Sequence, residues 1–116
     1  MKSLSDTLPK TKFHLQPRFT TILHPVRIEM GLSVNEYVII DGIDQTSHRP
    51  DHPWCTISKD AMADWTGFSR RTVFRAIERG LQLELVEKNE RGDLRSTTKW
   101  INAVRLYKAK TSIASK

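Results

Sequence analysis

The chain has 116 residues, enough for one domain with one modest hydrophobic core. Hydrophobic residues make up 38% and charged residues 28%, which is typical of a globular protein, and no apolar run approaches the roughly 20 residues that span a bilayer. The net charge of +6 favours a polyanionic partner, and the single cysteine, Cys55, excludes an internal disulfide framework and favours a reducing compartment.

The first 30 residues contain no strong helix signal. Residues 1–17 are polar and lack the apolar segment of a secretory signal peptide, so we expect a flexible arm on a cytoplasmic protein. Residues 18–30 are rich in β-branched and apolar side chains and are interrupted by Pro25, which predicts a short strand and then a second extended piece. The folded domain is expected over residues 18–107, and a basic, flexible tail over residues 108–116.

The first clear helix signal is the capping box formed by Ser33 and Glu36, whose side chains can each satisfy the other residue's backbone amide. A wide apolar stripe follows the box. The helix is expected to end near residues 45–47, because Pro50 and Pro53 cannot continue it. Residues 54–57 then predict a short buried strand.

Two further helices are separated by a short turn. Ser58 is an N-cap, and Asp60 in the first turn suits the positive end of the helix dipole. Gly67 ends this helix, because glycine readily adopts the left-handed conformation of a helix stop. Ser69 is the next N-cap and opens a helix over residues 70–82.

The helix over residues 70–82 is strongly amphipathic. Its apolar side is expected to carry Val73, Phe74, Ile77 and Leu81, which recur at the helical period. The opposite side displays a polar set of Arg71, Thr72, Arg75, Arg79 and Gln82. The sequence therefore predicts a row of guanidinium groups along one exposed stripe.

A β-hairpin is expected after this helix. Residues 85–88 and 100–104 are predicted to be its two strands, and the polar, glycine-containing residues 89–99 its loop. The loop carries three cations, Arg91, Arg95 and Lys99.

The predicted order of helix, turn, helix and basic hairpin is the layout of a winged helix-turn-helix, an α+β fold with a three-helix core. The major groove of DNA admits one α-helix, and arginine pairs bidentately with guanine or phosphate. Residues 66–116 carry 12 Lys or Arg against 5 Asp or Glu, whereas residues 1–65 carry 7 against 8. We therefore expect duplex DNA to be bound by the recognition helix (Ser69, Arg70, Arg71, Thr72, Arg75, Arg79), the wing (Arg91, Arg95, Lys99) and the start of the preceding helix (Ser58, Lys59).

Two segments resemble the winged-helix domains of phage and plasmid replication proteins and of related bacterial regulators: residues 32–36 and residues 56–77. The second segment includes WTGFSRRTVFRAI over residues 65–77. The resemblance covers roughly residues 30–105. It implies sequence-specific binding of double-stranded DNA, with origin recognition as the expected role and transcriptional regulation of a mobile element as the alternative. The chain departs from the pattern after the recognition helix, where Glu84 stands in place of the usual turn glycine.

Two other interpretations stay open at this stage. Arg75 can pair with Glu78 on a merely solvated helix face. A winged helix can also act as a protein-interaction module, and Glu84, Glu87 and Glu90 dilute the positive charge beside the wing. A homodimer is compatible with the motif, because groove readers commonly bind paired half-sites, and a replication or transcription protein is a further possible partner. A DNA-binding protein of this kind would be nucleoid-associated in the cytoplasm.

No enzymatic activity, cofactor or metal is expected. The spacing of His48, His52 and Cys55 resembles that of metal ligands, but structural zinc normally needs four. No phosphate-binding glycine loop, nucleophile motif or credible carboxylate pair is present in the sequence. The aromatic residues Trp65, Phe68 and Phe74 are assigned to the core.

Overall fold

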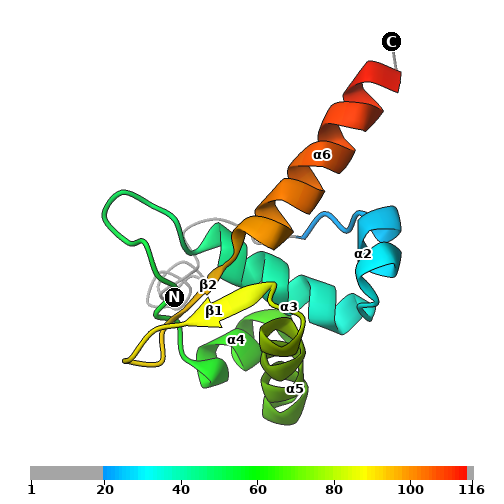
Figure 1. Ribbon diagram of the computed structural model, residues 1–116. Coiled ribbons are helices and arrows are strands. Elements are labelled where there is room, and N and C mark those ends of the chain that lie inside the picture. Colours follow the sequence, from blue (N-terminus) through cyan, green and yellow to red (C-terminus); the bar gives the residue numbers. More distant parts are fainter. Residues whose placement is uncertain (1–19, 115–116) are drawn as a thin grey trace, which may run out of the picture.

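The computed structural model describes residues 20–114 and shows an α+β domain (Figure 1). The elements follow in the order α2 (His24–Met30), α3 (Val34–Gln45), α4 (Lys59–Thr66), α5 (Arg70–Gln82), β1 (Val86–Lys88), β2 (Leu94–Ser96) and α6 (Thr98–Ala114). The strands form one antiparallel hairpin, in which Glu87 lies opposite Arg95. The arm expected over residues 1–17 lies outside the described residues.

Local signals place the three central helices where the sequence predicts them. The Ser33 hydroxyl accepts from the amide of Glu36, and the Glu36 carboxylate accepts from the amide of Ser33. Ser58 caps α4 and Ser69 caps α5, each by a hydroxyl that accepts a hydrogen bond from the amide three residues ahead. Gly67 ends α4 in the left-handed conformation, at φ 80°. The capping box, both serine caps and the bounds of α5 are therefore confirmed.

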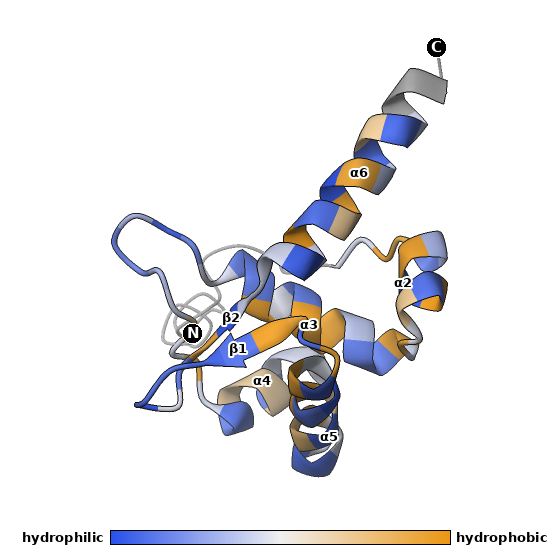
Figure 2. Cartoon of the chain, in the orientation of Figure 1, coloured by the Kyte–Doolittle hydropathy of each residue, from blue (hydrophilic) through white to orange (hydrophobic). Residues whose placement is uncertain are grey.

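The core lies between α3, α5, the hairpin and the first turns of α6. Ile40 and Ile43 of α3 and Val73 of α5 are completely buried. Trp100 of α6 is equally inaccessible and packs against Tyr37 of α3, with ring centroids 5.0 Å apart. Figure 2 shows this arrangement as hydrophobic segments of α3, α5 and β1 that face one another. One shared core therefore joins the helical layer to the hairpin.

The strand expected within residues 18–30 is wrong, because residues 24–30 form α2. Pro25 occupies the first turn of this helix, where its missing amide hydrogen has no hydrogen-bonding role and its fixed φ suits the helix. Gly31 then ends α2 at φ 76°, and Arg27 donates from Nη1 to the carbonyl of Leu32 at 2.9 Å. A proline that suggested a break in a strand thus marks the start of a helix.

The second strand of the hairpin also differs from the expectation. It consists of residues 94–96 rather than 100–104, because Gly92 at φ 91° and Asn89 close a tighter turn. Residues 98–114 form α6, so the segments expected as a strand at 100–104 and as a tail from residue 108 belong to one helix. The strand expected at residues 54–57 is reduced to a single antiparallel bridge between Cys55 and Leu94.

Candidate nucleic-acid interface

The segment expected to form a helix-turn-helix consists of α4, a turn over residues 67–69, and α5. The Thr66 hydroxyl donates to the carbonyl of Met62 and accepts from the amide of Phe68, which fixes the path of the chain through the turn. Phe68 is half-buried against the core. The turn is therefore held at both ends, so that the start of α5 has a defined position relative to α4.

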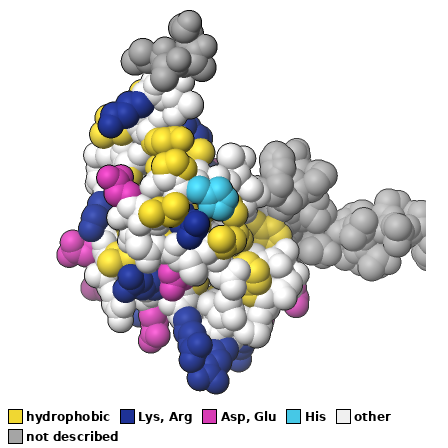
Figure 3. Space-filling view, turned by 90° about the vertical axis from the view of Figure 1, so that its right-hand side faces the viewer, with side chains coloured by type: hydrophobic (Ala, Val, Ile, Leu, Met, Phe, Trp, Pro, Cys, Tyr) yellow, Lys and Arg dark blue, Asp and Glu magenta, His cyan; other side chains and the backbone are white. Residues whose placement is uncertain are grey.

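Arg71 and Arg75 are the most available cations of α5. Both are exposed, and neither makes a hydrogen bond or ion pair with any residue in the described part of the chain. The intrahelical pair between Arg75 and Glu78 that the sequence allowed is not formed. Figure 3 shows Lys and Arg side chains gathered at the lower end of the molecule, the end at which α5 lies in Figure 1. This face can neutralise an external anion without first breaking an internal contact.

Phe74 lies on this surface instead of in the core, and its assignment to the core is wrong. It is 40% exposed, with the Lys59 ammonium 5.4 Å and the Arg70 guanidinium 5.2 Å from its ring centroid. Arg70 also pairs with Asp60 at 3.1 Å in an exposed salt bridge. The start of α4 and the first two turns of α5 thus present an aromatic ring with two cations close to it.

The helical period explains the misplacement of Phe74. The buried stripe of α5 is centred on Val73, Ala76, Ile77 and Gly80. Phe74 lies about 100° of helical rotation away from Val73, at the edge of that stripe. Gly80 lies at the centre of this buried stripe, where a larger side chain would not fit, because a Cβ at this position would lie 2.9 Å from Cγ2 of Val86.

Three other residues of the predicted recognition helix have internal roles. Ser69 caps α5, and its hydroxyl lies 3.0 Å from that of Thr72. Arg79 donates from Nη2 to the carbonyl of Gly31 at 3.3 Å and thereby links the end of α5 to the α2–α3 connection. The first two turns of α5, rather than its whole length, therefore form the free cationic surface.

The structure does not bring the three expected wing cations together. Arg91 is exposed at the turn of the hairpin. Arg95 pairs with Glu87 at 2.8 Å and lies over the ring of Trp54, 4.2 Å from its centroid. Lys99 belongs to α6, where its Nζ donates to the carbonyl of Leu83. Of the three cations expected in a wing, Arg91 is thus the one whose side chain has no partner among the described residues.

The loop that carries His48, His52 and Cys55 makes contacts that hold the fold together. Nε2 of His48 lies 2.9 Å from the carbonyl oxygen of Ser96, which can only accept, so this nitrogen donates. Cys55 is buried beside Leu94. Within residues 20–114, no group of three or more His, Cys, Asp or Glu side chains is placed to hold a metal ion.

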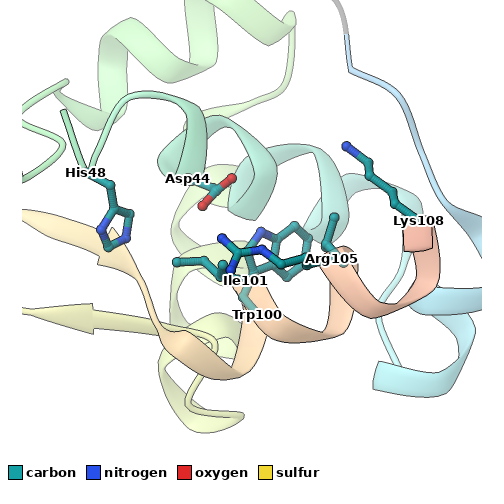
Figure 4. Close-up of a pocket in the computed structure, with 7 residues that line it drawn as sticks. Asp44, His48, Trp100, Ile101, Arg105 and Lys108 are labelled. Atoms are coloured by element: carbon teal, nitrogen blue, oxygen red, sulfur yellow. The ribbon is translucent and has the colours of Figure 1, made fainter. Parts of the chain in front are cut away.

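A cleft of about 400 Å³ lies between α3 and α6, away from α5 (Figure 4). Its lining includes Asp44 and His48 on one side and Trp100, Arg105 and Lys108 on the other. On the adjoining part of α3, burial raises the pKa of the Asp41 carboxyl to about 6, and the nearby Asp44 adds to the rise.

Comparison with protein-family models, with curated proteins and with solved structures found no match for the chain. None of the described helices is both long enough and apolar enough to cross a membrane.

Proposed function

We propose that this chain binds double-stranded DNA, with the first two turns of α5 in the major groove. The observation that carries the proposal is the exposed pair Arg71 and Arg75, which lie four residues apart on one helix and have no partner among the described residues. A guanidinium in this setting can donate two parallel hydrogen bonds to guanine or to a phosphate.

The residues around this pair support the same interpretation. Lys59 and Arg70 lie beside the α5 face and would meet the phosphates that flank the groove. Phe74 close to them offers an apolar contact of the kind that thymine methyl groups receive. Arg91 on the hairpin would reach the backbone next to the groove.

The cellular role we propose is origin recognition in phage or plasmid replication, with regulation of transcription as the alternative. This role rests on the resemblance of residues 30–105 to the winged-helix domains of replication proteins and related regulators. Both roles use such a domain, so the resemblance is compatible with either. A bound site within an array of direct repeats would favour replication, whereas a site overlapping a promoter would favour regulation.

The test is fluorescence anisotropy of the full chain with a labelled duplex over a range of salt concentrations. A dissociation constant on the order of micromolar, weakening steeply with salt, is expected for a protein that displaces counterions from several phosphates. The double variant R71A/R75A should bind at least about tenfold more weakly, because each arginine contact is worth roughly 1–3 kcal/mol.

Arg49→Ala is the matched control. Arg49 is an exposed cation of the loop after α3, and its side chain hydrogen-bonds only to the carbonyl of Gln45 among the described residues. R49A should bind DNA like the parent chain. Equal affinities of R71A/R75A and the parent, or no binding even at low salt, would refute groove reading by α5.

A further inference from the structure

An acidic side chain lies within the cationic surface at the starts of α4 and α5. Asp60, in the first turn of α4, has a side chain that is 72% exposed, and its Oδ1 lies 3.1 Å from Nε of Arg70, the first residue of α5. A carboxylate at this place repels the phosphates of any duplex that approaches the surface. Asp60 therefore weakens DNA binding unless its contact with Arg70 contributes something in return.

The stability of the two helices does not depend on this contact. Both side chains are exposed, and an ion pair in that setting contributes little to folding. The favourable interaction of Asp60 with the positive end of α4 needs no partner, and the hydroxyls of Ser58 and Ser69 already cap α4 and α5. The role of the pair is thus to be sought in what it does to Arg70.

The guanidinium of Arg70 is held by two contacts from two helices. Asp60 of α4 holds its Nε side, and the ring of Phe74, one turn further along α5, lies with its centroid 5.2 Å from Cζ. Its Nη1 and Nη2 groups donate to none of the described residues. An arginine that is ordered before binding loses less conformational entropy when it binds a ligand. Arg70 therefore presents the outer edge of its guanidinium in a restricted position.

This outer edge suits one backbone phosphate. Nη1 and Nη2 can donate two parallel hydrogen bonds to two phosphate oxygens. Such a contact carries no sequence information itself, but it fixes the register of a protein on the duplex. Because Arg70 is the first residue of α5, a phosphate bound there determines where along the groove Arg71 and Arg75 meet the bases.

We propose that Asp60 is a positioning residue for DNA recognition, which orients Arg70 toward one phosphate and so sets the register of α5 in the major groove. This inference rests on the proposed binding of duplex DNA by α5. Asp60 lowers the affinity for every duplex through its charge, and it raises the preference for the correct site through Arg70. Removal of the carboxylate should therefore move affinity and discrimination in opposite directions, whereas a change of charge alone shifts the affinities for all sequences together.

The experiment compares two duplexes at the same salt concentration by fluorescence anisotropy of the full chain. One is a duplex that the parent chain selects from a random pool, and the other is a scrambled duplex of the same composition. D60A should bind the scrambled duplex about two- to threefold more tightly than the parent does, because one unit of repulsion is lost. The ratio of the two dissociation constants, which measures discrimination, should fall at least about threefold.

Asp64→Ala is the matched control for charge. Asp64 is an exposed acid of the same helix, and it has no partner among the described residues. D64A removes the same charge but keeps the pair between Asp60 and Arg70, so it should leave the discrimination ratio unchanged. D60E keeps a carboxylate within reach of Arg70 and should retain the ratio within about twofold.

A double-mutant cycle ties the effect to Arg70. R70A should lower the discrimination ratio as D60A does, and the double variant D60A/R70A should lower it no further than R70A alone. Circular dichroism melts verify that each variant folds. Additive losses of discrimination in D60A and R70A would show that Asp60 does not act through Arg70.

The outcomes separate this inference from the function on which it rests. A discrimination ratio of D60A equal to that of the parent would overturn the positioning role, while weaker binding by R71A/R75A would still support groove reading by α5. A parent chain that binds DNA but prefers no selected duplex would overturn the positioning role as well. A parent chain that binds no duplex even at low salt would refute the proposed function and this inference together.

Discussion

The Ser96 hydroxyl donates to Oδ1 of Asp44 at 2.6 Å and so joins β2 of the hairpin to the last turn of α3. The two residues are 52 positions apart in the sequence, and Ser96 is completely buried. Nε2 of His48 approaches the same residue, at 2.9 Å from its carbonyl oxygen and 3.0 Å from its hydroxyl. This small network sets the position of the hairpin relative to the helices.

Replacing Ser96 by alanine should destabilise the fold by about 1–3 kcal/mol, because the half-buried Asp44 carboxylate loses a short hydrogen bond from a completely buried hydroxyl. Asp44→Asn should have a smaller effect, since the amide oxygen can still accept from Ser96. Urea unfolding followed by circular dichroism measures both. Equal stability of S96A and the parent would show that the network does not hold the hairpin.

Gly42→Ala should destabilise the protein although alanine is the better helix former. A Cβ at this position of α3 would lie 2.5 Å from Cη2 of Trp65, so the indole ring must shift. Overpacking of this kind costs about 1–3 kcal/mol, more than the roughly 1 kcal/mol gained in helix propensity. Chemical denaturation gives the free energy of unfolding, and the cost of G42A should shrink in a W65L background. An increase in stability for G42A alone would contradict the close packing.

Glu84→Gly should stabilise the protein. Glu84 has φ 61°, a left-handed conformation that costs a residue with a Cβ roughly 1–2 kcal/mol more than glycine. Part of this gain is offset by the greater backbone freedom of glycine in the unfolded chain, so we expect a net gain of about 0.5–1 kcal/mol in thermal or urea unfolding.

Glu90→Gly is the control for this effect. Glu90 is exposed in the turn of the hairpin and does not have a positive φ, so the same substitution there adds only unfolded-state freedom. It should be neutral or destabilising. A loss of stability in E84G similar to that in E90G would mean that the backbone at residue 84 is not strained.

Asp41 should give the stability a specific dependence on pH. Burial and the neighbouring Asp44 raise its pKa to about 6 in the folded state, from an ordinary value of 3.8. The folded state therefore holds a proton that the unfolded state has released, so stability should fall as the pH rises from about 4 to 6 and then level off. Asp41→Asn should remove this component and raise the stability at pH 7.

Urea unfolding of the parent and of D41N at pH 4.5 and 7.5 measures the effect as a difference between the two chains. Charge repulsion among the other residues is common to both chains and cancels in this difference. From pH 4.5 to pH 7.5 the free energy of unfolding should fall more for the parent than for D41N. The same pH dependence in both variants would assign the titration to another group.

The two arginines of the hairpin should differ in their effect on DNA binding. Arg91 is exposed and unpaired among the described residues, whereas Arg95 is already engaged by Glu87 and Trp54. R91A should therefore weaken binding and reduce the salt dependence by about one counterion. R95A should change DNA affinity less and thermal stability more. Anisotropy and thermal melts on the same samples distinguish the two, and the reverse ranking would assign the DNA contact to Arg95.

Where the physical cause was local, the sequence alone determined the structure. A serine hydroxyl caps the amide three residues ahead whatever surrounds it, so Ser33, Ser58 and Ser69 mark the starts of α3, α4 and α5. Glycine ends a helix because it lacks a Cβ, and Gly67 marks the end of α4. The amphipathic period of α5 likewise placed Arg71 and Arg75 outside. These features define the candidate DNA-binding face.

Tertiary packing decided the rest. Residues 24–30 and 98–104 are rich in side chains that suit strands, yet they are helical, α2 in contact with α6 and Trp100 of α6 packed against Tyr37 of α3. Such short apolar segments have nearly balanced preferences, and burial in one shared core outweighs them. Which cations remain free was decided in the same way. Arg79 and Lys99 donate to the distant carbonyls of Gly31 and Leu83, and Arg95 lies over the distant ring of Trp54, contacts that only the fold brings within reach.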